Sequence, residues 1–179
     1  MALVLVELKP AVGSREELTP IFDRIAAVVR RDGGEVIEIQ VGAGLTPVYV
    51  VAEHAEPAGL LAALSASGEA VSDVAEVRLV GATLEQVKAS RGAADYLVEW
   101  ALPTTLTMDT YLARKREKSP LYAKVPEVRF LRTYVREDMA KCLCLYDAPD
   151  EDAVCRARAA VETPFDRVTR LAGVPNVSR

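Results

Sequence analysis

Histidine is almost missing from this sequence, since only His54 among 179 residues carries an imidazole. Hydrolases with a Ser-His-Asp or Cys-His set use imidazole as their general base, and no such set is indicated here. Cysteine is also scarce: the chain has three, and their spacing is not that of a disulfide framework. Such a cysteine content is typical of a protein in a reducing compartment. Cys142 and Cys144 lie two apart on an expected strand, without evident third and fourth ligands. We therefore expect no metal site.

Three further features are absent. The net charge is −4, and no stripe of Lys and Arg with interleaved aromatic residues indicates nucleic acid. No segment approaches the roughly 18 apolar residues of a membrane span, and the first residues lack the pattern of a signal peptide. No glycine-rich phosphate loop joins a strand to a helix. We expect a cytoplasmic protein without a cofactor, a nucleic-acid partner or a membrane partner.

Half of the residues are hydrophobic, and they form short segments with strand or helix periodicity. The pattern predicts strands at 3–8, 36–41, 48–52, 74–80, 96–102, 128–135, 141–146 and 168–171. Helices are expected after Ser14, at 57–64, from Thr107, and from Pro149 to about Val161. Ser14 and Glu17 have the spacing of a capping box. The basic run 114–118, interrupted by Glu117, is interpreted as the solvated face of a helix.

The same order of elements occurs twice, at an offset of about 92 residues. Leu5-Val6-Glu7 falls on Leu97-Val98-Glu99, and Arg78-Leu79 falls on Arg170-Leu171. The repetition predicts an α+β fold made of tandem ferredoxin-like βαββαβ repeats. We place the first repeat at 1–82, a partly helical linker at 83–94 and the second repeat at 95–174.

Several predicted strands carry apolar residues at both odd and even positions, so both faces of the sheet are apolar. A single βαββαβ repeat does not explain an apolar second face. Helices cover one sheet face of a βαββαβ unit, so its strands should alternate apolar and polar residues. Segments 3–6, 48–52, 96–98 and 142–145 do not alternate. Two sheets packed face to face within the chain would bury both faces and form an intrachain α/β barrel of the dimeric α/β-barrel type. The alternative is a homodimer in which the open faces of two chains meet. An eight-stranded barrel can hold side chains or one small ligand.

Glu7 and Glu99 are the first candidates for catalysis, because each lies within an apolar strand at the same point of its repeat. Two carboxylates that face one cavity can act as general acid and base. The structural alternative is that each meets an arginine or solvent at the end of its strand. Arg132 is the third catalytic candidate, since a guanidinium can hold a carboxylate or an enolate.

Four other side chains are candidates for substrate binding. Tyr134 shares a strand face with Arg132, and Tyr146 ends the following strand. Trp100 follows Glu99 directly, and His54 falls on Tyr146 at the repeat offset. The alternatives are an exposed loop histidine at position 54 and, for Cys142 and Cys144, small hydrophobic side chains in the core.

The second half contains three distinctive stretches: Tyr96-Leu-Val-Glu-Trp-Ala-Leu-Pro103, Val128-Arg-Phe-Leu-Arg-Thr-Tyr-Val135 and Lys141-Cys-Leu-Cys-Leu-Tyr-Asp-Ala-Pro-Asp-Glu-Asp-Ala-Val154. They are followed by Pro164-Phe-Asp-Arg-Val-Thr. Over residues 95–171 the chain resembles a small bacterial ferredoxin-like family that was long filed as a domain of unknown function and is often labelled nickel-binding. The resemblance implies a ferredoxin-like fold for this half and suggests nickel as a ligand.

The function favoured by these patterns is a cofactor-independent enzyme of the cyclase, isomerase or monooxygenase type, or a ligand-binding relative of one. It would act on a small, largely apolar metabolite in the barrel, as in secondary metabolism and biosynthesis. This step rests on analogy with what such folds host. Two alternatives stay open: a nickel-binding protein without catalytic activity, and a structural or interaction module.

Overall fold

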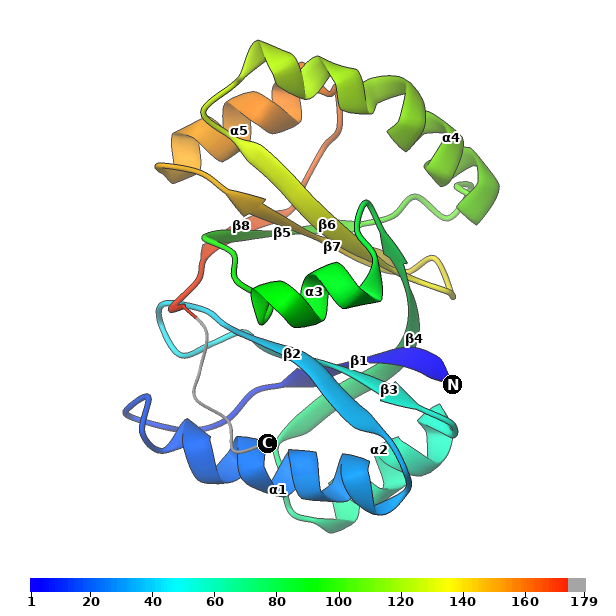
Figure 1. Cartoon of the computed structure of the whole chain (residues 1–179), viewed down its shortest axis with the longest axis vertical. Coiled ribbons are helices and arrows are strands. Elements are labelled where there is room, and N and C mark those ends of the chain that lie inside the picture. The colour runs from blue at the N-terminus through cyan, green and yellow to red at the C-terminus, as the bar shows by residue number, and fades with distance from the viewer. Residues whose placement is uncertain (174–179) are drawn as a thin grey trace. The chain divides into compact units, whose positions relative to one another are not determined.

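The computed structural model describes residues 1–173, which form two compact units (Figure 1). The first unit comprises residues 1–77, residues 83–93 and the segment that begins at Leu171. The second unit comprises residues 78–82 and 94–170. Each unit has its own hydrophobic core, so each is described by itself.

The first unit is an antiparallel sheet with helices on it. Its elements are β1 (Ala2–Leu8), α1 (Leu18–Arg31), β2 (Glu35–Val41), β3 (Val48–His54), α2 (Pro57–Ala66), β4 (Val71–Val80) and α3 (Leu84–Ser90), with the last residues of β4 in the second unit. The strand order is β2-β3-β1-β4. Helices α1 and α2 lie on one face of this sheet (Figure 1), where Phe22 and Ile25 pack with Val4, Val6 and Val50.

Helix α1 begins at Leu18, four residues after the predicted cap at Ser14. Pro20 accounts for the difference, because a proline ring clashes with the carbonyl four residues earlier and is tolerated only in the first helical turn. The backbone N–H of Gly13 and the hydroxyl of Ser14 donate to the carboxylate of Glu17 instead, which forms a turn ahead of the helix. The predicted capping box is therefore wrong as a helix start.

The segment predicted to be a partly helical linker contains a fully capped helix, α3. The Thr83 hydroxyl accepts a hydrogen bond from the Gln86 backbone N–H, and the Gln86 side chain accepts one from the Thr83 backbone N–H. This reciprocal pair is a capping box. Just beyond the helix, Gln40 of β2 donates to the Gly92 carbonyl. These contacts fix α3 on the face of the first sheet that α1 and α2 leave uncovered (Figure 1).

The second unit repeats this plan. Its elements are β5 (Tyr96–Ala101), α4 (Met108–Lys118), the 3-10 helix η1 (Ser119–Lys124), β6 (Arg129–Arg136), β7 (Lys141–Asp147), α5 (Glu151–Ala160) and β8 (Arg167–Arg170). The strands pair antiparallel in the order β6-β7-β5-β8. Helices α4, η1 and α5 lie on one face of this sheet (Figure 1). The α+β class with antiparallel sheets is thus confirmed.

Capping and one proline shape the helices of the second unit. Thr107 caps α4 as predicted, and the Asp150 carboxylate accepts a hydrogen bond from the Ala153 N–H at the start of α5. Pro120 has no N–H to bond the carbonyl four residues back, so α4 ends and the chain tightens into η1. The backbone N–H and the hydroxyl of Ser119 both donate to the Lys115 carbonyl at this end.

The two sheets share the same strand order and the same irregularity. In each unit the second and third strands pair through a bulge, which lies at Ile37 in β2 and at Leu131 in β6. The register also places Glu7 and Glu99 at equivalent points of β1 and β5. These matches are what a duplicated unit would produce.

The alignment of the two repeats at one fixed offset contains a gap. The β6–β7 hairpin lies two residues further along the chain than the offset between β1 and β5 requires. Because of this insertion, the position equivalent to Tyr146 is Ala52, and His54 is not its counterpart.

Side chains on both faces of the central strands are buried. Val4 and Leu5 of β1 are 0% and 1% exposed, and Val98 and Leu97 of β5 are also 0% and 1% exposed. Burial of alternate residues on both faces agrees with the pattern that led to the barrel interpretation, which itself stays a prediction.

None of the helices formed by residues 1–173 is long and apolar enough to cross a membrane.

Candidate functional site

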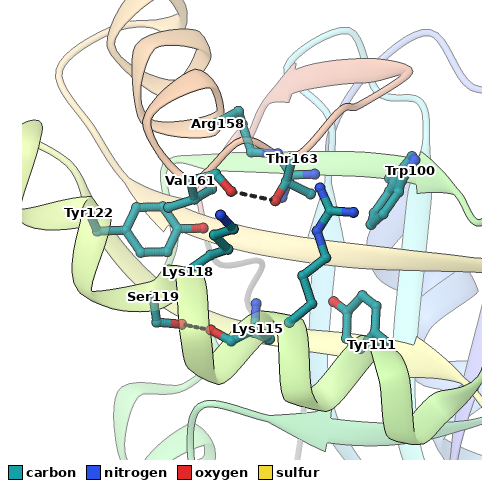
Figure 2. A pocket seen from close by; sticks show the side chains of 10 residues that line it. Trp100, Tyr111, Lys115, Lys118, Ser119, Tyr122, Arg158, Val161 and Thr163 are labelled. Carbon is teal, nitrogen blue, oxygen red and sulfur yellow. Dashed lines mark hydrogen bonds between the residues drawn. The ribbon is translucent and has the colours of Figure 1, made fainter.

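A pocket lies on the helix-covered face of the second unit, between α4 with η1 and α5 (Figure 2). It contains about 380 Å³ of empty space, part of it open to solvent. Aromatic and cationic side chains dominate its wall. The lining residues are Trp100, Tyr111, Arg114, Lys115, Lys118, Ser119, Tyr122, Arg158, Val161 and Thr163.

Helix α4 provides most of one wall because of its periodicity. Tyr111, Arg114, Lys115 and Lys118 have spacings of three and four residues, which place them on one helix face. The basic run 114–118 was predicted to be the solvated face of a helix. The prediction is correct for Arg116, which is exposed. It is wrong for Lys115, whose side chain turns inward beneath the helix and is half-buried.

Arg158 enters the pocket from α5 and is only 2% exposed. Its Nη1 lies 3.2 Å from the Tyr146 hydroxyl and 3.6 Å from the Cys144 Sγ, and its Nη2 donates to the Pro164 carbonyl. The guanidinium carbon lies 6.0 Å from the centre of the Trp100 ring. Among the described residues, no carboxylate pairs with Arg158, and its buried Nε has no hydrogen-bond partner. A buried guanidinium in this state carries an unsatisfied donor and an excess of positive charge.

Lys115 adds a second cationic group without a carboxylate. Its Nζ donates to the Thr133 hydroxyl oxygen at 3.1 Å and lies 4.0 Å from the centre of the Phe130 ring. Within residues 1–173 no aspartate or glutamate is paired with it. Burial lowers the pKa of its ammonium group below the ordinary value, negative charge on Cys144 and Cys142 opposes this shift, and the charge of Arg158 adds to it.

The floor of this region contains two thiols on one face of β7. A hydrogen bond from Cys142 holds the pKa of Cys144 well below its usual range, and burial opposes this shift. The charges of Lys115 and Arg158 and a hydrogen bond from the Thr133 hydroxyl, at 3.2 Å, act in the same direction as Cys142. The pKa of Cys142 is raised correspondingly. Cys144 is therefore the thiol of the pair that ionises more readily, and a thiolate there would balance only one of the two positive charges.

Three tyrosines complete the wall and the floor. Burial raises the pKa of Tyr122 to about 12 and raises those of Tyr111 and Tyr146 well above the ordinary value. The Tyr122 and Tyr146 hydroxyls share a hydrogen bond of 2.8 Å, and the Tyr122 ring is stacked on Phe130. These phenols stay neutral at physiological pH, so they do not cancel the positive charge.

The rim of the pocket is held by Glu162. Its carboxylate pairs with Lys118 at 2.7 Å, and its backbone carbonyl accepts a hydrogen bond from Arg114 at 2.6 Å. Lys118 is thus neutralised, whereas Arg114 donates to the Glu162 carbonyl, acts on the Glu162 carboxylate through its charge alone and contributes a further positive charge. Figure 2 shows the Lys118, Lys115 and Arg158 side chains directed toward the same space.

The structure places only part of the predicted site at this pocket. Trp100 lines it, and Tyr146 lies at its floor beside Arg158. Arg132 and Tyr134, which are 3% and 1% exposed, alternate with Thr133 on β6 and lie on the opposite sheet face. They share that face with Glu99.

Glu99 is paired with a cation. Its carboxylate lies 2.5 Å from the Arg167 guanidinium across the β5–β8 register, and its side chain is 12% exposed. Glu7 lies in the first unit and pairs in register with Tyr49 and Asp73. A common cavity for Glu7 and Glu99 concerns both units together and stays a prediction.

His54 is buried in the first unit, so the alternative of an exposed loop histidine is wrong. It is 1% exposed, and its Nδ1 accepts a hydrogen bond from the Glu56 backbone N–H at 3.0 Å. Gly34 lies so close to the ring that an added Cβ would be 2.9 Å from it. The histidine is therefore packed into the first unit at the end of β3.

Sequence reasoning missed Lys115 and Arg158, which are the main features of the pocket. Lys115 lies in a basic run whose face toward the core is revealed only by Tyr111 four residues earlier. Arg158 continues the buried face of α5 that begins with Ala153 and Val154. A charged residue at an apolar helical position was the available signal for Arg158.

Nickel, which the resemblance implies, can be tested against the donor groups that are present. Nickel is commonly bound by imidazole and by square-planar or octahedral sets of donors. The single imidazole belongs to the first unit, and its Nδ1 already accepts a hydrogen bond. No cluster of three or more His, Cys, Asp or Glu side chains occurs in the part of the chain that the structure describes. These residues do not fit a nickel site within the chain.

Two solved structures have the same fold over nearly the whole chain. One, described as "Putative Chlorite dismutase TA0507", has a TM-score of 0.52 and 14% identity and covers 96% of this chain and 95% of its own. The other, an anthrone oxidase-like protein, has a TM-score of 0.51 and 10% identity and covers 98% of this chain and 92% of its own. At such low identity the likeness establishes the fold alone.

Sequence comparison is more specific for the second half. No curated protein matches the chain. The family model for Nickel responsive protein SCO4226-like matches residues 96–171, which is most of the second unit and includes every residue that lines the pocket. The resemblance of the C-terminal half to the family labelled nickel-binding is thereby confirmed for residues 96–171, which make up less than half of the chain.

Proposed function

We propose that the second unit binds a small molecule that carries a negative charge, in the pocket between α4 and α5. The observation that carries this proposal is a pair of cations, the buried Arg158 and the half-buried Lys115, without a carboxylate partner among the described residues. A Cys144 thiolate would balance one positive charge, and the exposed Arg114 adds another. A ligand with a carboxylate or an enolate would restore neutrality and would satisfy the free Nε of Arg158.

The aromatic wall supports a flat apolar body for this ligand. Trp100 and Tyr111 lie with ring centres 6.4 Å apart, and Tyr122 faces the pocket from η1. Indole and phenol rings bind planar groups by stacking and by burial of apolar area. The small size of the pocket favours a compact ligand. The largely apolar metabolite expected from the sequence is therefore refined to an amphipathic, anionic one.

We propose further that the protein is a cofactor-independent enzyme, or a ligand-binding relative of one, within the range of cyclases, isomerases and monooxygenases. Cations and phenols around one site can stabilise an enolate or another developing oxyanion without a bound cofactor. The fold itself is compatible with many reactions and selects none of them. The shared strand order and bulge positions of the two units support duplication, and with it the intrachain α/β barrel as their arrangement.

Calorimetric titration of the whole chain with benzoate and with benzamide tests the binding proposal. The two rings have the same shape, and only benzoate is charged, so we expect benzoate to bind at least about tenfold more tightly. Arg158→Met should weaken benzoate binding by about tenfold or more. Arg156→Met is the matched control on the same helix, because Arg156 is exposed and pairs with Glu127 outside the pocket.

Equal affinity for benzoate and benzamide, or equal effects of the two arginine variants, would contradict the proposal. If Arg158→Met does not fold, Arg114→Met removes charge from the exposed rim and gives the same comparison without disturbing the core.

The family match favours a second candidate, a protein that responds to nickel. The donor groups of the described residues do not form a site for this ion within one chain. Metal analysis after dialysis against a weak chelator separates the candidates, since about one retained equivalent of nickel would favour the second.

A further inference from the structure

Lys115 differs from the other lysines near the pocket in its surroundings. Lys118 is held by the Glu162 carboxylate, and Lys124 is exposed to solvent. The Lys115 amine has only a hydroxyl oxygen and an aromatic ring as close partners, and it lines the pocket. An amine in such a site loses much of the hydration that stabilises its protonated form.

A proton acceptor lies two hydrogen bonds away from this amine. The Lys115 Nζ donates to the Thr133 Oγ1, and the Thr133 hydroxyl in turn donates to the Cys144 Sγ. A proton that passes along this chain leaves a neutral amine on Lys115 and a neutral thiol on Cys144. The charge of the nearby Arg158 repels the ammonium form of Lys115, whereas negative charge on Cys144 or Cys142 acts in the opposite direction.

We propose that Lys115 is a nucleophile that forms an imine with an aldehyde or ketone ligand whose carboxylate is held by Arg158 and Arg114. This inference rests on the proposed anion site and adds the carbonyl as the second recognised group. The geometry that supports it is the common pocket wall of Lys115, Arg114 and Arg158. Figure 2 shows Lys115 and Arg158 in this wall. Neutral lysines in apolar surroundings beside another cation are suited to this chemistry.

The reaction balances without any other reactant. The Lys115 nitrogen forms a bond to the carbonyl carbon, and the resulting carbinolamine loses its oxygen as water. The two amine protons leave with that oxygen, and a C=N bond replaces the C=O bond. Water reverses the reaction and restores the amine. Neighbouring hydroxyl groups, such as those of Thr133 and Tyr122, are placed to exchange protons during dehydration.

Borohydride trapping tests the inference on the whole chain at pH 7.5, with 4-formylbenzoate as the anionic probe and benzaldehyde as the neutral one. Peptide mapping by mass spectrometry then locates the reduced adduct. We expect 4-formylbenzoate to label Lys115 at least about tenfold faster than any other lysine, because an ordinary lysine is less than about 1% neutral at this pH. The exposed N-terminal amine is an independent site that the mapping separates.

Two variants give the controls. Lys115→Arg keeps the positive charge and removes the nucleophile, so it should abolish the pocket adduct. Lys124→Arg changes an exposed lysine on η1 and should leave the Lys115 adduct unchanged. Labelling spread evenly over the lysines, or an unchanged adduct pattern in Lys115→Arg, would overturn the inference.

The same samples distinguish this inference from the proposed function. Benzoate has no carbonyl that can form an imine, so its calorimetric affinity reports the anion site alone. Benzoate binding without a Lys115 adduct would overturn the imine and leave the anion site intact. Loss of both would overturn the two together.

Discussion

Arg158 shows how a buried charge is tolerated in the second unit. The desolvation cost of such an ion is several kcal/mol, and it is offset in part by donation to Tyr146, to the Pro164 carbonyl and to Cys144. Its Nε receives no such compensation from the described residues. A group that is costly to the fold and incompletely satisfied within it is best explained by a bound ligand, which is why the proposed function depends on this side chain.

At the scale of residues, the tyrosines provide a prediction for alkaline pH. The pKa of Tyr122 is raised to about 12, and those of Tyr111 and Tyr146 are also raised by burial. Because the folded values exceed the unfolded one of about 10, this stabilisation is complete below pH 10 and is lost as the pH rises further. Between pH 10 and 12 the free energy of unfolding should therefore fall as the pH rises.

Urea denaturation at several alkaline pH values measures that slope. Tyr122→Phe removes one of the three phenols, so its slope should be smaller than that of the parent chain. Equal slopes for the variant and the parent chain would contradict the account.

Glu99 gives a second prediction at this scale. Its ion pair with Arg167 suggests that it stabilises the β5–β8 edge, whereas its expected catalytic role stays a prediction. Arg167 is more than half exposed, so Glu99→Gln should lower the free energy of unfolding by only about 1 kcal/mol. Arg167→Gln should have a similar effect, because either change breaks the same pair.

The comparison of thermal midpoint with turnover separates the two roles of Glu99 once a substrate is known. A variant with full activity and reduced stability supports the structural role. A variant with reduced turnover and an unchanged midpoint would establish the catalytic role instead, and Glu7→Gln provides the equivalent test in the first unit.

At the scale of elements, Asp150 controls the helix that carries Arg158. Its carboxylate caps α5 through the Ala153 N–H at 2.8 Å. Asp150→Ala should lower the free energy of unfolding by about 1 kcal/mol, as is typical for loss of an N-cap. Asp152→Ala is the control, because this exposed carboxylate lies in the same turn and makes no capping bond. Equal losses in a denaturation experiment would show that charge at the helix start, and not the cap, is responsible.

The elements also show how far the sequence can predict this structure. Strand periodicity and caps at Thr107 and Asp150 are local features, and the structure reproduces them. The start of α1 differs because the restriction imposed by Pro20 acts one turn upstream. The pocket could not be predicted, since it depends on which face of α4 turns toward β6 and β7. That choice is made by tertiary packing around Tyr111 and Arg158, which no local pattern specifies.

At the scale of the whole molecule, the intrachain barrel requires both units for burial of both faces of each sheet. We therefore expect the two units to unfold together. Trp100 is the single tryptophan, and it lies in the second unit, so its fluorescence follows that unit alone. Far-ultraviolet circular dichroism follows the helices and strands of both units. Coincident transitions in urea would indicate one cooperative molecule. Two separate transitions would contradict the intrachain barrel.

The central claim is that the second unit recognises an anion beside an aromatic wall, and Trp100 reports on it directly. Trp100 lines the pocket 6.0 Å from the Arg158 guanidinium, so a ring bound there must change the surroundings of the indole. The decisive measurement is a titration of tryptophan fluorescence with benzoate and with benzamide at constant ionic strength. We predict a saturable change with benzoate at concentrations at least about tenfold lower than with benzamide. Identical curves for the two compounds, or no saturable change with either, would contradict the claim.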